Sequence, residues 1–181
     1  MASHIASLIM EAMNAECCQN FAGPKHTLVD FHRMMTRLVE MEDSQYSYRN
    51  VLAAYTSGGI LAGICVAYDG GKLHQLRRRF YEAALEAFGI DYTGMTDETE
   101  DGEFYIDSLA VSSNFRGKGI ASQLLQATIE RGAELGIPTV GLLVDKGNPK
   151  AEALYRRLGF VYVNDSTWGG HPMRHLQYKH D

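Results

Sequence analysis

The stretch Tyr105–Ala121 reads YIDSLAVSSNFRGKGIA, and it decides the fold. An apolar strand pattern ends at Val111, a short polar turn follows, and a glycine-punctuated loop then carries Arg116 and Lys118. An amphipathic helix begins directly after this loop. The first backbone N–H groups of a helix lack partners and lie at the positive end of its dipole, so this succession of elements predicts a phosphate site.

The loop itself narrows the choice of phosphate ligand. Residues 116–122 read RGKGIAS, which fits neither the nucleotide P-loop nor the dinucleotide Gly-x-Gly-x-x-Gly fingerprint. A nucleotide-binding regulatory domain is therefore a poor alternative. The loop does fit the pattern Arg-x-x-Gly-x-Ala, with Arg116, Gly119 and Ala121 at the fixed positions. Glycines here allow the backbone to approach a phosphate without an intervening Cβ.

A second pattern lies downstream, separated from the first by one expected helix and one expected strand. Residues 148–160 read NPKAEALYRRLGF and fit Asn-x-x-Ala-x-x-x-Tyr-x-x-x-Gly-Phe. The two patterns, in this order, resemble the GNAT family, the Gcn5-related N-acetyltransferases that bind acetyl-CoA. The resemblance is clear over residues 51–179 and weak over the first 50.

The resemblance implies a single N-acetyltransferase domain over residues 1–181. Its fold would be α/β, with a central mixed and mostly antiparallel sheet, splayed between the fourth and fifth family strands, and helices on both faces. Two features depart from the family. The first helix begins almost at Met1, so the usual first strand is missing or is replaced by a very short piece, and the connection over residues 70–102 is enlarged. Both lie with residues 1–50 on the side where the family binds its acceptor.

Hydrophobic periodicity and capping signals predict the elements of this fold. Helices are expected over residues 3–18, from Thr27 onward, over 72–89 to Gly89, over 117–135, and from Asn148 with Pro149 in the first turn. Strands are expected over 51–55, 60–68, 103–111, 139–144, 160–163 and 172–179. The order of elements indicates one mixed α/β domain without an internal repeat.

Composition restricts the partners and the compartment. The net charge is −5, which argues against nucleic acid as an electrostatic partner. No apolar run approaches 18 residues, so no membrane span is expected. Three cysteines without a Cys-x-x-Cys spacing predict reduced thiols in a cytoplasmic protein.

The resemblance assigns acetyl-CoA to the two patterns. Backbone groups of Leu109 and Val111 would hold the pantetheine arm, and the N–H groups of residues 116–121 would hold the pyrophosphate. Asn148 would reach the pantetheine amides, cap its helix, or do both. The expected cofactor-binding residues are Leu109, Val111, Arg116, Gly117, Lys118, Gly119, Ile120, Ala121, Asn148 and Tyr155.

Three residues are candidates for the general acid and the general base of the reaction. Tyr155 has a reference pKa of about 10, which suits protonation of a departing thiolate, although a core tyrosine is the alternative. Glu103, Tyr105 and Asp107 share one face of their strand, since side chains alternate. Asp107 and Glu103 are therefore the candidate general bases, and solvated or hydrogen-bonded carboxylates are the alternative.

Several other chemical groups have simpler interpretations. The acidic residues of 97–103 predict a solvated loop, with attraction of a cationic amine as the alternative. His171 and His175 read as surface histidines, since strand alternation makes a poor metal site of them, and Cys65 reads as a core residue. Trp168 would line the acceptor pocket or cover the edge of the core.

These observations predict an acyltransferase that moves an acetyl group from acetyl-CoA to a primary amine by direct attack in a ternary complex, without a metal. A non-catalytic acyl-CoA-binding sensor module is the alternative. The identity of the amine and the acyl chain length stay open. The resemblance also implies a homodimer through the exposed edge of a final strand.

Overall fold

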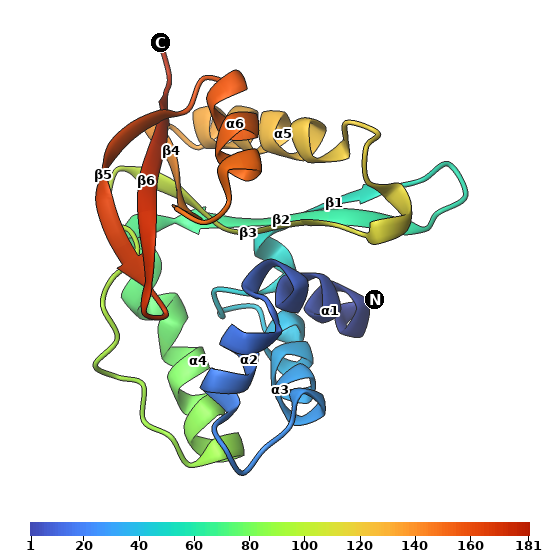
Figure 1. Ribbon diagram of the computed structural model, residues 1–181, viewed down its shortest axis with the longest axis vertical. Helices are drawn as coiled ribbons and strands as arrows, with labels where there is room; N and C mark the ends of the chain where they lie inside the picture. The colour runs from blue at the N-terminus through green and yellow to red at the C-terminus, as the bar shows by residue number, and fades with distance from the viewer.

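The computed structural model describes residues 1–181, folded as a six-stranded sheet with helices on both faces (Figure 1). The strands are β1 (Val51–Tyr55), β2 (Leu61–Asp69), β3 (Glu103–Val111), β4 (Thr139–Asp145), β5 (Val161–Trp168) and β6 (His171–Lys179). The helices are α1 (Ala2–Met13), α2 (Ala15–Ala22), α3 (Leu28–Glu40), α4 (Leu73–Phe88), α5 (Ile120–Glu134) and α6 (Pro149–Arg157). The predicted mixed α/β class is confirmed.

The sheet is antiparallel except at its centre. Its order is β1-β2-β3-β4-β6-β5, and β3 with β4 is the parallel pair. That pair joins residues 103–106 of β3 to residues 139–142 of β4, although β3 continues to Val111 and β4 to Asp145. Beyond this short ladder, β3 pairs only with β2 and β4 pairs only with β6. The two central strands therefore part in mid-sheet.

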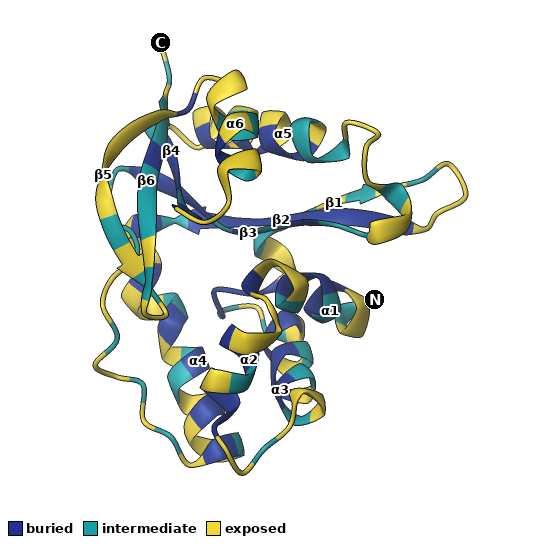
Figure 2. Ribbon diagram, viewed as in Figure 1, coloured by how far each residue is buried: buried dark blue, intermediate teal, exposed yellow.

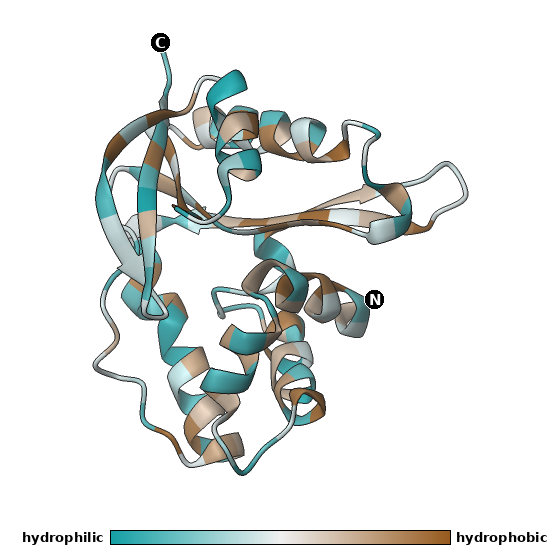
Figure 3. Ribbon diagram, in the orientation of Figure 1, coloured by the Kyte–Doolittle hydropathy of each residue, from teal (hydrophilic) through white to brown (hydrophobic).

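Each face of the sheet has its own apolar core. Helices α1–α4 lie on one face, and α5 and α6 lie on the other (Figure 1). The first core includes Phe31, Leu38 and Ile64, all fully buried. The second includes Leu125 and Phe160. Figure 2 shows the burial along β2 and on the inward sides of the helices, and Figure 3 shows how apolar residues follow it.

Local signals in the sequence place several helix ends correctly. Thr27 and Asp30 form the expected capping box at the start of α3. Gly89 ends α4 in the left-handed conformation, with φ of 69°. The Asn148 side chain accepts a hydrogen bond from the backbone N–H of Ala151 at 3.2 Å, and Pro149 occupies the first turn of α6.

The expected single helix over residues 3–18 is wrong, because the chain breaks at Asn14. Asn14 has φ of 73°, and α1 ends before it at Met13. Its side chain then accepts the backbone N–H of Cys17 at 2.9 Å and caps α2. A positive φ is uncommon outside glycine, and asparagine is one of the residues enriched there, so this short polar residue can end one helix and begin the next.

The remaining differences are small. Strand β5 extends to Trp168 rather than ending near residue 163, since it pairs with β6 along a hairpin. Helix α1 is the first element of residues 1–181. None of the helices combines the length and the apolar character needed to cross a membrane.

Candidate active site

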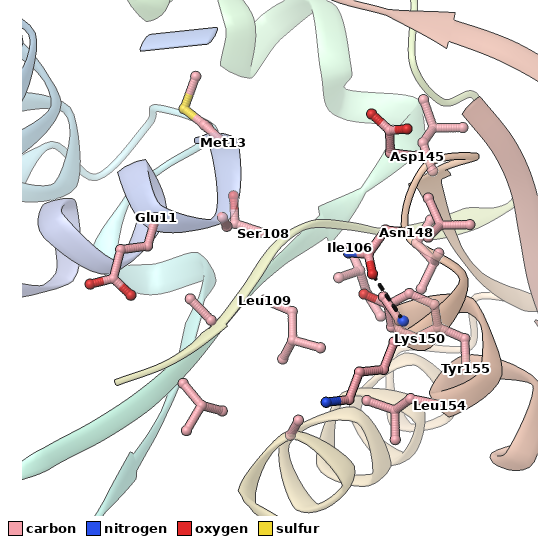
Figure 4. A pocket seen from close by; sticks show the side chains of 18 of the residues that line it. Glu11, Met13, Ile106, Ser108, Leu109, Asp145, Asn148, Lys150, Leu154 and Tyr155 are labelled. Carbon is pink, nitrogen blue, oxygen red and sulfur yellow. Dashed lines mark hydrogen bonds between the residues drawn. The ribbon is translucent and has the colours of Figure 1, made fainter. Parts of the chain in front are cut away.

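A cavity of about 760 Å³ lies where β3 and β4 part. Residues 106–111 of β3 and 142–145 of β4 contribute to its walls. The rest of its lining comes from both faces of the sheet. Figure 4 shows Glu11 and Met13 of α1 on one side of β3, and Leu154 and Tyr155 of α6 on the other. The cavity therefore connects the two faces through the sheet.

The glycine loop borders this cavity at the start of α5. Gly117 and Gly119 have φ of 76° and 77°, a region that glycine adopts without steric cost. An added Cβ at either position would meet no atom within 4 Å, so the glycines serve the backbone path and leave the space beside it open. The loop and the first turn of α5 line the cavity with Arg116, Gly117, Gly119, Ile120, Ala121 and Ser122. The succession of strand, glycine loop and helix is the one that the sequence predicts, and phosphate binding by the loop stays a prediction.

The two cations of the loop behave differently. The Arg116 Nε donates to the carbonyl oxygen of Val111 at 3.2 Å, and the guanidinium lies 3.6 Å from the Glu11 carboxylate. Arg116 lines the cavity, whereas Lys118 does not. The Lys118 ammonium instead lies 5.5 Å from the centre of the Phe115 ring. The structure thus brings Arg116, but not Lys118, to the cavity.

Four other expected ligands of the cofactor meet in the cavity. Leu109 and Val111 line it from β3, and Asn148 and Tyr155 line it from α6 and its cap. The Tyr155 ring packs edge-on against Phe160, with 6.1 Å between ring centres. Burial raises the pKa of Tyr155 to about 12. Its hydroxyl therefore stays protonated over the whole physiological range, as a proton donor requires.

Asp107 is held at the cavity by a polar network. Its Oδ2 accepts from the Tyr68 hydroxyl at 2.7 Å and from the Gln45 amide at 3.3 Å, and its Oδ1 accepts from Ser108 at 3.1 Å. Burial raises the pKa of Asp107, and these hydrogen bonds oppose the shift by favouring the charged carboxylate. A carboxylate with a raised pKa is a better proton acceptor than an ordinary aspartate.

Sequence reasoning missed Tyr68 and Gln45. Tyr68 lies opposite Tyr105 in the β2–β3 ladder. Its contact with Asp107 therefore depends on the register between the two strands, which a single sequence does not contain. Gln45 comes from the segment between α3 and β1, 62 residues from Asp107 in the chain. No local pattern signals that contact.

Glu103, the second candidate base, lies away from the cavity. It is 2% exposed, and it accepts hydrogen bonds from Thr99 at 2.7 Å and Gln177 at 2.7 Å, with His175 as a third partner. Gly141 provides the space, because an added Cβ there would collide with this carboxylate. The structure does not bring Glu103 and Asp107 together. The prediction that His175 is a surface residue is wrong, since its side chain is only 17% exposed.

The expectation of a solvated acidic loop fails at Glu98. Its side chain is 7% exposed and lies 3.2 Å from the guanidinium of Arg77, which is 2% exposed. The Tyr105 hydroxyl also donates to Glu98 at 2.8 Å. Burial raises the pKa of Glu98 to about 7, with Asp107 adding to the shift and Arg77 opposing it. This buried pair joins the segment that follows α4 to α4 itself, within the enlarged connection.

Cys65 lies in the core, and Trp168 lies at the wall of the cavity. Cys65 is fully buried, as predicted, and accepts a hydrogen bond from Thr128 at 3.2 Å. Trp168 lines the cavity, and its ring packs against Phe21, with 5.9 Å between ring centres. Its indole N–H is buried without a hydrogen-bond partner. No group of three or more His, Cys, Asp or Glu side chains is arranged to hold a metal ion.

Comparisons with known proteins agree with this architecture. A solved structure described as the crystal structure of an acetyltransferase superimposes with a TM-score of 0.78 at 27% identity, covering 98% of this chain and 94% of the other. An N-acetyltransferase from Staphylococcus aureus Mu50 shares the fold, with a TM-score of 0.77 at 20% identity over 97% of this chain and 94% of the other.

Curated relatives match over shorter parts of their length. The mycothiol acetyltransferase of Propionibacterium freudenreichii subsp. shermanii is 36% identical over 78 residues, which are 42% of this chain and 24% of that protein. The chloroplastic GCN5-related N-acetyltransferase 4 of Arabidopsis thaliana is 25% identical over 87% of this chain and 60% of its own length. The chain thus spans less than two thirds of either relative.

The family model for the acetyltransferase (GNAT) family matches residues 24–160, which include the glycine loop, Asp107 and the Asn148–Phe160 pattern. The family uses acetyl-CoA as its co-substrate. With the fold, the parted central strands and both sequence patterns in agreement, the chain belongs to the acetyltransferase (GNAT) family.

Proposed function

We propose that this chain transfers an acetyl group from acetyl-CoA to a primary amine by direct attack in a ternary complex. The observation that carries the proposal is the cavity that passes through the sheet. The glycine loop and α6 border it on one face, and α1, α2 and the β5–β6 hairpin border it on the other. Donor and acceptor can therefore enter from opposite faces and meet where β3 and β4 part.

On the donor side, the proposed site for the pyrophosphate is the start of α5. The N–H groups of residues 116–121 and the helix dipole favour an anion there, and Arg116 lies within the same wall. The pantetheine arm would run along the unpaired edge of β3 past Leu109 and Val111. A backbone N–H near Val111 would then stabilise the oxyanion that forms on the thioester carbonyl.

At the junction, Asp107 is the proposed base and Tyr155 the proposed acid. Asp107 accepts a proton from the ammonium form of the acceptor, directly or through one water, so that the neutral amine attacks the carbonyl carbon. The C–N bond forms, and the positively charged nitrogen of the tetrahedral intermediate gives its second proton to solvent water, from which Tyr155 is later reprotonated. The intermediate then collapses and the C–S bond breaks. Tyr155 donates its proton to the departing thiolate, which gives the amide and free CoA. Glu103 takes no part in this scheme, because it does not line the cavity.

Calorimetric titration with acetyl-CoA, with ATP and NAD as controls, tests donor binding. We expect saturable binding of acetyl-CoA alone, followed by release of free thiol in the presence of a suitable amine. Binding without thiol release across a broad amine panel would favour the acyl-CoA sensor instead. Absence of acetyl-CoA binding would refute both functions.

A further inference from the structure

The acceptor side of the cavity has a composition of its own. We call it the acceptor arm and define it by Glu11, Met13, Asn14, Cys17, Trp168 and Met173, which all line the cavity. They come from the junction of α1 with α2 and from the β5–β6 hairpin. Asp107 lies at the inner end of the arm, on the strand that separates it from the donor side.

The charges of the arm are negative and leave no free cation. Glu11 lies at its rim, and Asp107 lies at its inner end. The one arginine near the rim is Arg116, whose guanidinium is already 3.6 Å from the Glu11 carboxylate. Among the other lining groups that can carry positive charge, Lys150 and Arg157 belong to α6 on the donor side. His171 on the β5–β6 hairpin has its Nδ1 3.8 Å from the Asp145 carboxylate. An entering carboxylate would meet two acids and no unpaired positive charge.

The middle of the arm is lined by apolar and polarisable side chains. Met13, Cys17, Met173 and the indole of Trp168 form its walls. Thioether and thiol side chains are polarisable and adapt to aromatic or aliphatic groups. The unpartnered indole N–H of Trp168 can donate one hydrogen bond, but it cannot neutralise a charge. These walls favour an apolar body behind the reacting amine.

We propose that the acceptor is a small primary amine on an apolar body that carries no carboxylate, so that free α-amino acids are excluded. This inference rests on the proposed function. The ammonium of the acceptor is attracted by Glu11 and Asp107, and the apolar body packs against Trp168 and the sulfur-bearing side chains. A carboxylate on the same molecule is rejected by charge repulsion and by desolvation without a partner.

Matched pairs of compounds test the proposal, because each pair differs only by the carboxylate. The pairs are phenethylamine with phenylalanine, and 3-(methylthio)propylamine with methionine. Trp168 is the sole tryptophan of the chain, so its fluorescence reports binding in the arm without any need for turnover. The titrations are made with CoA at saturation, and the initial rates of thiol release are made with acetyl-CoA.

We expect each amine to change Trp168 fluorescence at a concentration lower by on the order of tenfold or more than its amino acid, with kcat/KM ordered likewise. Equal or tighter binding of the amino acids would overturn the proposal. So would the absence of any fluorescence change with either amine at millimolar concentration. Loss of the proposed function looks different: the amines bind in the arm, but acetyl-CoA does not bind or no thiol is released.

A charge variant adds a specificity readout. Glu11→Gln removes the negative charge at the rim, so the preference for amine over amino acid should narrow by roughly twofold to fivefold, as for an exposed charge pair. Glu134→Gln is the matched control, since Glu134 is exposed, pairs with Arg131 and lies outside the cavity. An unchanged preference in Glu11→Gln would contradict the role of the rim charge.

Discussion

Replacing Tyr155 with phenylalanine separates its chemical role from its packing role. The ring packs against Phe160, and phenylalanine preserves that contact. The hydroxyl has no hydrogen-bond partner within the chain, so removing it should change the free energy of unfolding by less than about 1 kcal/mol. For a chain of this size, that corresponds to a change in Tm of no more than a few degrees.

The effect on turnover should be much larger. A positioned general acid contributes roughly 100-fold to 10,000-fold to a rate, so Tyr155→Phe should lower kcat by that range while the Kd for acetyl-CoA stays within about threefold. Thiol release gives kcat, and calorimetry gives the Kd. Tyr178→Phe is the control, because Tyr178 also packs against Phe160 but does not line the cavity. An unchanged kcat in Tyr155→Phe would refute the assignment of the acid.

Three further predictions concern the buried polar residues Tyr68, Arg77 and Glu98. Tyr68→Phe removes a hydrogen bond that favours the charged form of Asp107, so the acidic limb of the kcat–pH profile should move to higher pH; a shift to lower pH would contradict the base assignment. Arg77→Met leaves the buried carboxylate of Glu98 without its partner and should cost about 3–5 kcal/mol in urea denaturation at pH 8, whereas a cost below 1 kcal/mol would show that the pair is dispensable. Because the folded pKa of Glu98 is raised to about 7, its contribution to stability is present at acidic pH and is lost as pH rises to about 7; Glu98→Gln should flatten that slope in thermal unfolding, and an unaltered slope would assign it to other groups.

Much of the fold follows from local signals. The capping box at Thr27, the proline after Asn148 and the glycine after α4 each mark a helix end in the sequence, and each is confirmed. These signals act over a few residues, so a single sequence contains them in full. Asn14 carried a signal of the same kind. The apolar residues keep their helical spacing across the break as far as Cys17, so this spacing predicts one continuous helix and hides the signal of Asn14.

In the candidate site, the donor side follows from local sequence patterns, whereas the acceptor side does not. The donor side depends on two short patterns, and the expected cofactor-binding residues line one cavity, apart from Lys118. The acceptor side depends on contacts between segments far apart in the chain, such as Trp168 with Phe21. The roles of Asp107 and Glu103 diverge for a similar reason. The alternation of side chains along β3 predicts that Asp107 and Glu103 share one face of the strand. The strand pairing decides which of them lines the cavity, because Glu103 lies within the paired stretch of β3 and β4 and Asp107 lies beyond it.

The measurement that tests the central claim most directly is the mass balance of a single reaction. Purified protein, acetyl-CoA and phenethylamine are incubated together, and free CoA thiol and N-acetylated amine are quantified by mass spectrometry. The proposed mechanism predicts one acetylated amine for each CoA released, with both products strongly reduced in Asp107→Asn. Thiol release without acetylated amine, or bound acetyl-CoA that stays intact with every amine tried, would contradict it.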